Sequence, residues 1–156
     1  MSSESKQATI IDAGEGRKLN VLGHAVTVRL PSADTHGDSY VFEVITPPGL
    51  AVPPHVHKYE DEYGYIAEGT WEIFLDGRTY EAKSGAMLHC PRHTSHGFRN
   101  IGSTTGKMIW LSTPGAAVER FFDELGALPV DAPPDMEKVV GIFAKYSIQV
   151  VPPPEM

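Results

Sequence analysis

The chain has 156 residues, a length that fits one domain with a hydrophobic core of its own. Its 15 glycines and 13 prolines are many for this length, and the turns they suggest favour an all-β design with short strands over a helix bundle. Thirteen basic against 20 acidic residues give a formal net charge of −7 without a Lys/Arg cluster, which argues against nucleic acids and anionic membranes as partners.

Short β-strands are predicted through the first half of the chain. The evidence is alternation of apolar and polar residues, enrichment in β-branched and aromatic residues, and turn residues between these runs. In order, the expected elements are two or three strands within 8–30, a loop at 32–39, a strand at 40–46, a proline-rich approach at 47–54, and two strands joined by a turn within 62–75.

The second half of the chain begins with a strong hairpin signal at Asp76–Gly77, since Asp-Gly suits a two-residue turn. Further short strands are separated by regular turns as far as residue 113, and this pattern predicts a sandwich or a small barrel. These strands are expected at 78–82, 86–90, 96–100 and 107–113.

After Pro114 the pattern changes from strands to helices. Apolar residues near helical spacing predict a helix within 116–128, and Asp135 is a plausible N-cap for a second amphipathic run within 131–146. We expect these helices to pack on the outside of the barrel or on a partner subunit. The chain is therefore interpreted as one domain, residues 1–156, with a barrel at about 8–114 and a helical extension at about 115–156.

Candidate metal ligands come from two segments of the chain: His55, His57 and Glu62 from the first, and His96 from the second. His55 and His57 are two residues apart, so on a strand both side chains point to the same face. The gap before Glu62 is long enough for the chain to bend and bring a third donor inward, and His96 needs only to fall on a neighbouring strand. Imidazole and carboxylate groups rarely gather in this way without a metal to hold.

These two segments resemble the two motifs of the cupin superfamily, and the chain looks like its quercetinase-type and related dioxygenase members. Residues 49–69 fit G-x5-H-x-H-x4-E-x6-G at every fixed position. Residues 85–100 fit G-x5-P-x-G-x2-H-x3-N with one departure, His93, where the family usually has Gly. The resemblance implies an all-β fold, the cupin double-stranded β-helix or jelly-roll-like barrel, here with short C-terminal helices.

The resemblance also implies that His55, His57, Glu62 and His96 bind one divalent transition metal per subunit. Three imidazoles with one carboxylate suit Fe, Ni, Co, Mn or Zn, and the ligand set does not choose among them. A six-coordinate ion would keep two positions open for substrate, water or O2. The alternative is a cupin barrel whose site is vacant or holds a metal without a role.

Other candidate site residues lie close to the ligands. His89 could face the cavity as an acid or base, because histidine titrates near neutral pH, or it could be a solvent-facing or satisfied core histidine. Glu62 could also take a proton from the substrate, as the ligand carboxylate can in related dioxygenases. Glu60 and Asp61 are interpreted as solvated, or as orienting the ligand loop. Candidates for a substrate pocket, each with barrel core or an ordinary loop position as the alternative, are Tyr65, Trp71, His93, Phe98 and Trp110.

Cys90 is the one cysteine of the sequence, so no intramolecular disulfide can form, and it is interpreted as a small buried hydrophobe. The N-terminal segment lacks an apolar signal core, and no stretch reaches the roughly 18 apolar residues of a membrane span. We therefore expect a cytoplasmic protein without a membrane partner. We also expect a homodimer, since small cupins usually pair through sheet edges, with the N-terminal strands and C-terminal helices at the contact.

Three functions are compatible with these features. The first is a metal-dependent enzyme, a dioxygenase-like oxidoreductase, acting on a small substrate that chelates through two oxygens, such as a flavonol, catechol or enediol. The second keeps the metal without redox chemistry, as an isomerase, epimerase or lyase. The third is a non-catalytic module that binds a metal and a small ligand. A requirement for O2 separates the first from the second, and a ligand recovered unchanged supports the third.

Overall fold

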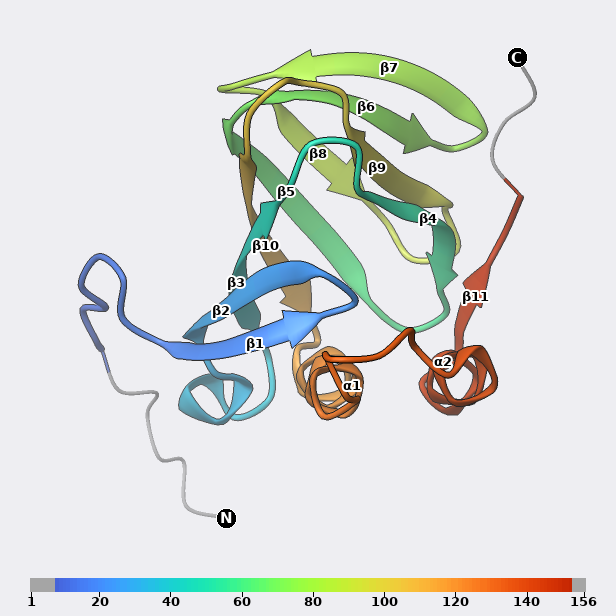
Figure 1. Cartoon of the computed structure of the whole chain (residues 1–156). Coiled ribbons are helices and arrows are strands. Elements are labelled where there is room, and N and C mark those ends of the chain that lie inside the picture. Colours follow the sequence, from blue (N-terminus) through green and yellow to red (C-terminus); the bar gives the residue numbers. More distant parts are fainter. Residues whose placement is uncertain (1–7, 153–156) are drawn as a thin grey trace.

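A computed structural model of the chain describes residues 8–152, and within this part eleven strands form two facing antiparallel sheets with two α-helices at one end (Figure 1). The helices are α1 (Ala116–Gly126) and α2 (Met136–Lys145). The strands are β1 (Arg17–Val21), β2 (His24–Leu30), β3 (Tyr40–Thr46), β4 (Ala51–His57), β5 (Asp61–Glu68), β6 (Thr70–Leu75), β7 (Arg78–Lys83), β8 (Met87–Cys90), β9 (His96–Asn100), β10 (Gly106–Thr113) and β11 (Ile148–Val150).

The two sheets are built from strands that are mostly distant in the sequence. One sheet has the order β1-β2-β3-β10-β5-β8, and the other has the order β11-β4-β9-β6-β7. Alternate residues of each strand point inward, so Phe42 of β3 and Trp110 of β10 meet Phe98 and Ile73 of the opposite sheet in one core. The all-β, jelly-roll-like fold with short C-terminal helices is confirmed.

Strand β4 departs from the prediction, because it begins inside the segment interpreted as a proline-rich approach. Pro53 and Pro54 lie within it, and the pairing of β4 with β9 shifts register between Val52 and His55. Proline has no N–H to donate, so inside a sheet it is tolerated at a bulge. A further strand, β11, pairs with β4 and was not predicted, whereas the two or three strands expected within 8–30 are two, β1 and β2.

The helices cover one end of the barrel (Figure 1). Val118, Phe121 and Leu125 of α1 are buried in the same core as the strands, so this helix closes the barrel end and does not merely lie against its outer surface. Asp135 caps α2 as predicted, because its Oδ1 accepts hydrogen bonds from the backbone N–H groups of Glu137 and Lys138. Neither helix is long and apolar enough to cross a membrane.

Candidate metal centre

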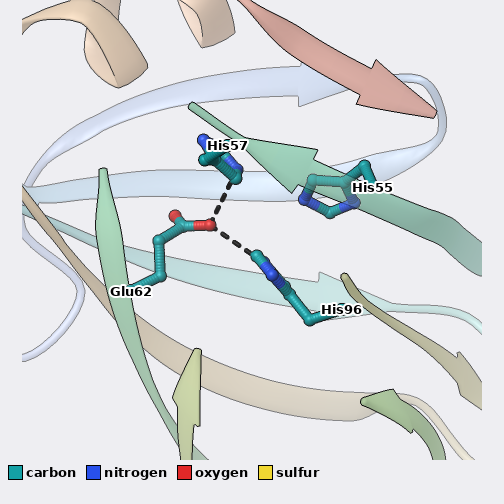
Figure 2. Close-up of side chains that lie close together, drawn as sticks. All are labelled: His55, His57, Glu62 and His96. Carbon is teal, nitrogen blue, oxygen red and sulfur yellow. Dashed lines mark hydrogen bonds and ion pairs between the residues drawn. The ribbon is translucent and has the colours of Figure 1, made fainter. Parts of the chain in front are cut away.

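Four side chains from three strands converge inside the barrel (Figure 2). His55 and His57 extend from β4, Glu62 from β5 and His96 from β9. One ligand atom from each residue lies within 4.8 Å of the others. His57, Glu62 and His96 are each 4% exposed, whereas His55 is partly exposed. The structure thus brings together the four residues that the motifs single out.

Strand pairing explains how the cluster forms. His55 on β4 lies directly opposite His96 on β9, and His57 is on the same face of β4, two residues further on. Glu62 comes from the other sheet, where it points inward together with Gly64 and Ile66. The cluster therefore joins the two sheets across the interior of the barrel, and each sheet contributes part of it.

Glu62 is the centre of the hydrogen-bond pattern. Its Oε1 accepts from Nε2 of His57 at 2.9 Å and from Nε2 of His96 at 3.0 Å (Figure 2). Its Oε2 accepts from the hydroxyl of Ser112, a fully buried residue of β10, at 2.5 Å. Ser112 thus holds one carboxylate oxygen and turns the other toward the imidazoles. The sequence did not single out Ser112, because it lies 50 residues from Glu62 and outside both motifs.

The outer nitrogens of two histidines are also held. Nδ1 of His55 donates to the carbonyl of Pro53 at 2.9 Å, and Nδ1 of His57 donates to the carboxylate of Glu60 at 3.1 Å. Such bonds fix the tautomer and the orientation of a metal-binding imidazole. Glu60 was expected either to be solvated or to orient the ligand loop. It is 3% exposed and bonded to a candidate ligand, so the orienting role fits its position.

His96 is positioned differently from the other two histidines. In the part of the chain that the structure describes, its Nδ1 has no hydrogen-bond partner. Its ring stacks on the indole of Trp110, with centroids 5.8 Å apart. The loop before His96 is fixed by Arg92, whose backbone N–H and guanidinium both bind the carboxylate of Asp61. At the outer nitrogen of this ligand, packing and a loop contact therefore take the place of a direct hydrogen bond.

The charges of the cluster are strongly coupled in the metal-free protein. Burial alone would lower the pKa of His57, but the carboxylates of Glu62 and Glu60 outweigh it and raise this pKa to about 10. Burial would raise the pKa of Glu62, but His57 and His96 hold it well below its usual range. Burial and the two neighbouring histidines keep the pKa of His55 well below its usual value. The cluster thus combines an ionised carboxylate with a neutral imidazole.

These residues fit a divalent transition metal. Three imidazole nitrogens and one carboxylate oxygen form a donor set of intermediate softness, which Fe, Mn, Co, Ni and Zn all accept. Atoms bound to one ion at about 2.1 Å lie at most about 4.2 Å apart, so the cluster needs only a small contraction to bind one. The identity of the metal does not follow from the donor set.

A cavity of about 120 Å³ adjoins the cluster. The four candidate ligands line it, together with apolar side chains from both sheets and from α1 and α2. His24, at the start of β2, also lines it and was not predicted. This histidine is buried, and its Nδ1 is hydrogen-bonded to the hydroxyl of Thr46 at 2.9 Å. The sequence gives no indication that His24 lines the cavity, because it is a single histidine outside both motifs.

Two of the aromatic residues predicted for the pocket line this cavity, and one does not. Phe98 and Trp110 lie in its wall, with Phe98 on the same face of β9 as His96. Trp71 is fully buried behind them and meets Phe98 edge to face, with centroids 5.3 Å apart. It is a residue of the barrel core and does not contribute to the cavity wall.

Three other candidates point away from the cavity. Tyr65 is 41% exposed and lies on the outer face of β5, opposite to Glu62. His89 is exposed on the outer face of β8, where it stacks on Tyr63. His93 is exposed in the loop before β9, with a positive φ of 69°. The expected acid–base role of His89 and the expected pocket roles of Tyr65 and His93 do not fit these positions.

Comparisons with known proteins agree with this geometry. The Cupin domain family matches residues 37–112, which include all four candidate ligands. Quercetin 2,3-dioxygenase of Bacillus subtilis is 30% identical over 117 residues, which cover 75% of this chain and 34% of that protein. Polyketide synthase CurC of Streptomyces cyaneus is 33% identical over 86 residues, which cover 55% of this chain and 53% of that protein. This chain thus spans about a third to a half of the length of these two relatives.

Among solved structures, KdgF from Halomonas sp. superimposes with a TM-score of 0.62 at 23% identity. The superposition covers 69% of this chain and 94% of that one, and it supports the fold alone. The two motifs, the barrel and the matched family model together show that this chain contains a cupin domain, at residues 37–112.

Proposed function

We propose that the protein is a metal-dependent oxidoreductase that oxidises a small organic substrate carrying two adjacent oxygens. The observation that carries this proposal is the convergence of His55, His57, Glu62 and His96 at the wall of an apolar cavity. The match to quercetin 2,3-dioxygenase supports the dioxygenase reaction type. In that reaction both atoms of O2 enter the product, so no separate reductant is needed.

The four residues would hold the metal, which when bound supplies Lewis-acid and redox chemistry to substrate oxygens. Ser112 keeps the carboxylate of Glu62 oriented, and Glu60 keeps the ring of His57 oriented. Glu62 is the one carboxylate among the described residues that line the cavity, so we propose it as the acceptor of a substrate proton. The aromatic and aliphatic wall excludes bulk water from the reacting groups.

The size of the cavity favours small substrates among those expected. Its volume is about 120 Å³. A cavity of about 150 Å³ in another protein binds benzene, and pockets for drug-sized ligands measure about 300–1,000 Å³. A catechol-like or enediol-like compound with at most one ring is therefore proposed ahead of a flavonol, which has three.

A second candidate is an isomerase or lyase that uses the same metal without O2. The inward carboxylate of Glu62 beside two imidazoles favours it, because proton transfer alone would then suffice. The two candidates differ in a simple way. The oxidoreductase consumes O2 together with its substrate, and the isomerase or lyase turns over equally well without O2.

Metal analysis followed by oxygen uptake tests the proposal. We expect about one transition-metal ion per chain in protein purified without a chelating tag, and loss of this metal in the double variant His57→Ala/His96→Ala. His89→Ala removes an exposed imidazole outside the cluster and should keep the metal. Wild-type protein that takes up no metal even on reconstitution would contradict the metal site, and loaded protein that consumes no O2 with any catechol or enediol would contradict the oxidoreductase.

A further inference from the structure

Beside the inner cavity lies a second hollow, which we call the outer groove. It has a volume of about 900 Å³ and runs along α2 and β11, and Lys58 and His93 are among the residues that line it. Four residues line both the inner cavity and the outer groove, namely Leu22, Pro53, Phe143 and Ile148. These side chains are therefore the partition between the metal-binding cavity and a much larger space that is open to solvent.

Phe143 is the largest of the four and lies on α2. Its ring meets that of Phe121 of α1 edge to face, with centroids 4.9 Å apart. Ile148 is the buried first residue of β11 and pairs with His57 of β4, and Pro53 lies in the bulge of β4, so both belong to the sheet. A smaller residue at position 143 would remove most of a ring from the partition and leave the strands in place.

We propose that Phe143 determines the substrate size that the cavity accepts. With its phenyl ring in place, the space beside the cluster admits a compound of about one ring. A substituent on that ring could extend into the outer groove only if the partition were opened. That this size limit determines which substrates are used rests on the proposed function. The size limit itself, the largest compound that fits beside the cluster, depends only on the shape of the protein.

The proposal is tested with apolar compounds and metal-free protein, so that the metal plays no part in the result. Benzene is the one-ring compound, and n-butylbenzene is the same ring with a chain. Binding is followed by NMR through the indole N–H signals of the two tryptophans. Trp110 lines the cavity and serves as the reporter, and Trp71 lies behind the wall with its indole bonded to the carbonyl of Glu68, so it serves as the internal reference.

In the wild type we expect benzene to shift the Trp110 signal and n-butylbenzene to bind at least about tenfold more weakly. In Phe143→Ala we expect n-butylbenzene to bind at least about tenfold more tightly than it does in the wild type. Val140→Ala changes a residue that lines the outer groove but not the cavity, and it should behave as the wild type does. Phe143→Leu disturbs the fold less than Phe143→Ala does. It should also bind n-butylbenzene more tightly than the wild type does, but by a smaller factor than Phe143→Ala.

Equal binding of both compounds by the wild type, no benzene binding, or no gain by either Phe143 variant would overturn the proposal. The unfolding temperature of each variant establishes that it is folded before the comparison is made. A protein that gives the expected pattern but takes up no metal would retain Phe143 as the size limit and overturn only the proposed oxidoreductase.

Discussion

At the scale of single residues, the candidate ligands are held by neighbours that the motifs do not include. Glu60 is the clearest case, because its buried carboxylate accepts the Nδ1 proton of His57 and leaves Nε2 turned toward Glu62. A negative charge at this position makes the imidazole a stronger electron donor and fixes its tautomer. Glu60 is thus a positioning residue that would act on a bound metal through His57.

We predict that Glu60→Gln weakens metal binding by about 10- to 100-fold. The amide can still accept the hydrogen bond from His57 but lacks the negative charge. The measurement is a competition titration of Zn²⁺ or Co²⁺ against a chromophoric chelator, together with the visible spectrum of the Co²⁺-loaded protein. Glu81→Gln, at an exposed position of β7, makes the same chemical change away from the site and should leave the affinity unaltered. An affinity for Glu60→Gln equal to that of the wild type would refute the role of Glu60.

At the scale of elements, the site depends on the close approach of β4 and β9, which carry the three histidines. Gly97 of β9 faces the bulge of β4. A Cβ at this position would lie 2.7 Å from both the carbonyl oxygen of Val52 and the backbone nitrogen of Pro54. Backbone atoms cannot move aside as the end of a side chain can. The two strands are therefore able to pair at this separation because position 97 carries no side chain.

We predict that Gly97→Ala separates these strands, lowers the free energy of unfolding by about 1–3 kcal/mol and weakens metal binding. Urea unfolding of the metal-free protein measures the first effect, and the chelator titration measures the second. Gly141→Ala is the matched control, because a Cβ there would meet nothing within 4 Å and α2 gains a better helix former. Unchanged stability and affinity in Gly97→Ala would show that the strands tolerate a wider spacing.

At the scale of the whole molecule, stability depends on buried histidines as well as on apolar packing. His24 is 5% exposed and hydrogen-bonded to Thr46, so it joins the start of β2 to the end of β3. Burial lowers its pKa below the ordinary value of 6.5, although a backbone hydrogen bond with Ala51 opposes this effect. Its neutral form is therefore the one that the fold accommodates.

The pH dependence follows from this lowered pKa. Above pH 6.5 His24 is neutral in both the folded and the unfolded chain. As the pH falls below 6.5, the unfolded chain takes up a proton at this position before the folded one does, so stability is lost. We predict that the free energy of unfolding of the metal-free wild type falls more steeply with acidification than that of His24→Gln, by up to about 1.4 kcal/mol per pH unit.

Urea unfolding of both proteins between pH 5 and pH 8 measures this difference. All other ionisable groups are the same in both proteins, so their contributions cancel when the two slopes are compared. Parallel profiles would mean that His24 does not set the pH dependence of stability below pH 6.5.

Local patterns in the sequence determined a large part of this protein. The two motifs identify all four candidate ligands: His55 and His57 share a strand face at any register, and Glu62 and His96 are assigned by the resemblance of the two segments to the cupin motifs. Strand β3 and the N-cap of α2 follow equally directly from alternation and from side-chain chemistry. Alternation also places Tyr65 opposite Glu62, three residues away on the same strand, so the sequence already argued against its role in the pocket.

The tertiary structure decided what depends on contacts between distant segments. The outward position of His89 follows from the pairing of Glu62 with Cys90, and the role of Ser112 from a contact across 50 residues. The burial of Glu60 and the position of Phe143 in the cavity wall likewise require the folded chain. A local pattern shows which side chains share a face of a strand, but which face turns inward, and what meets it there, is set by the pairing of strands and helices far apart in the sequence.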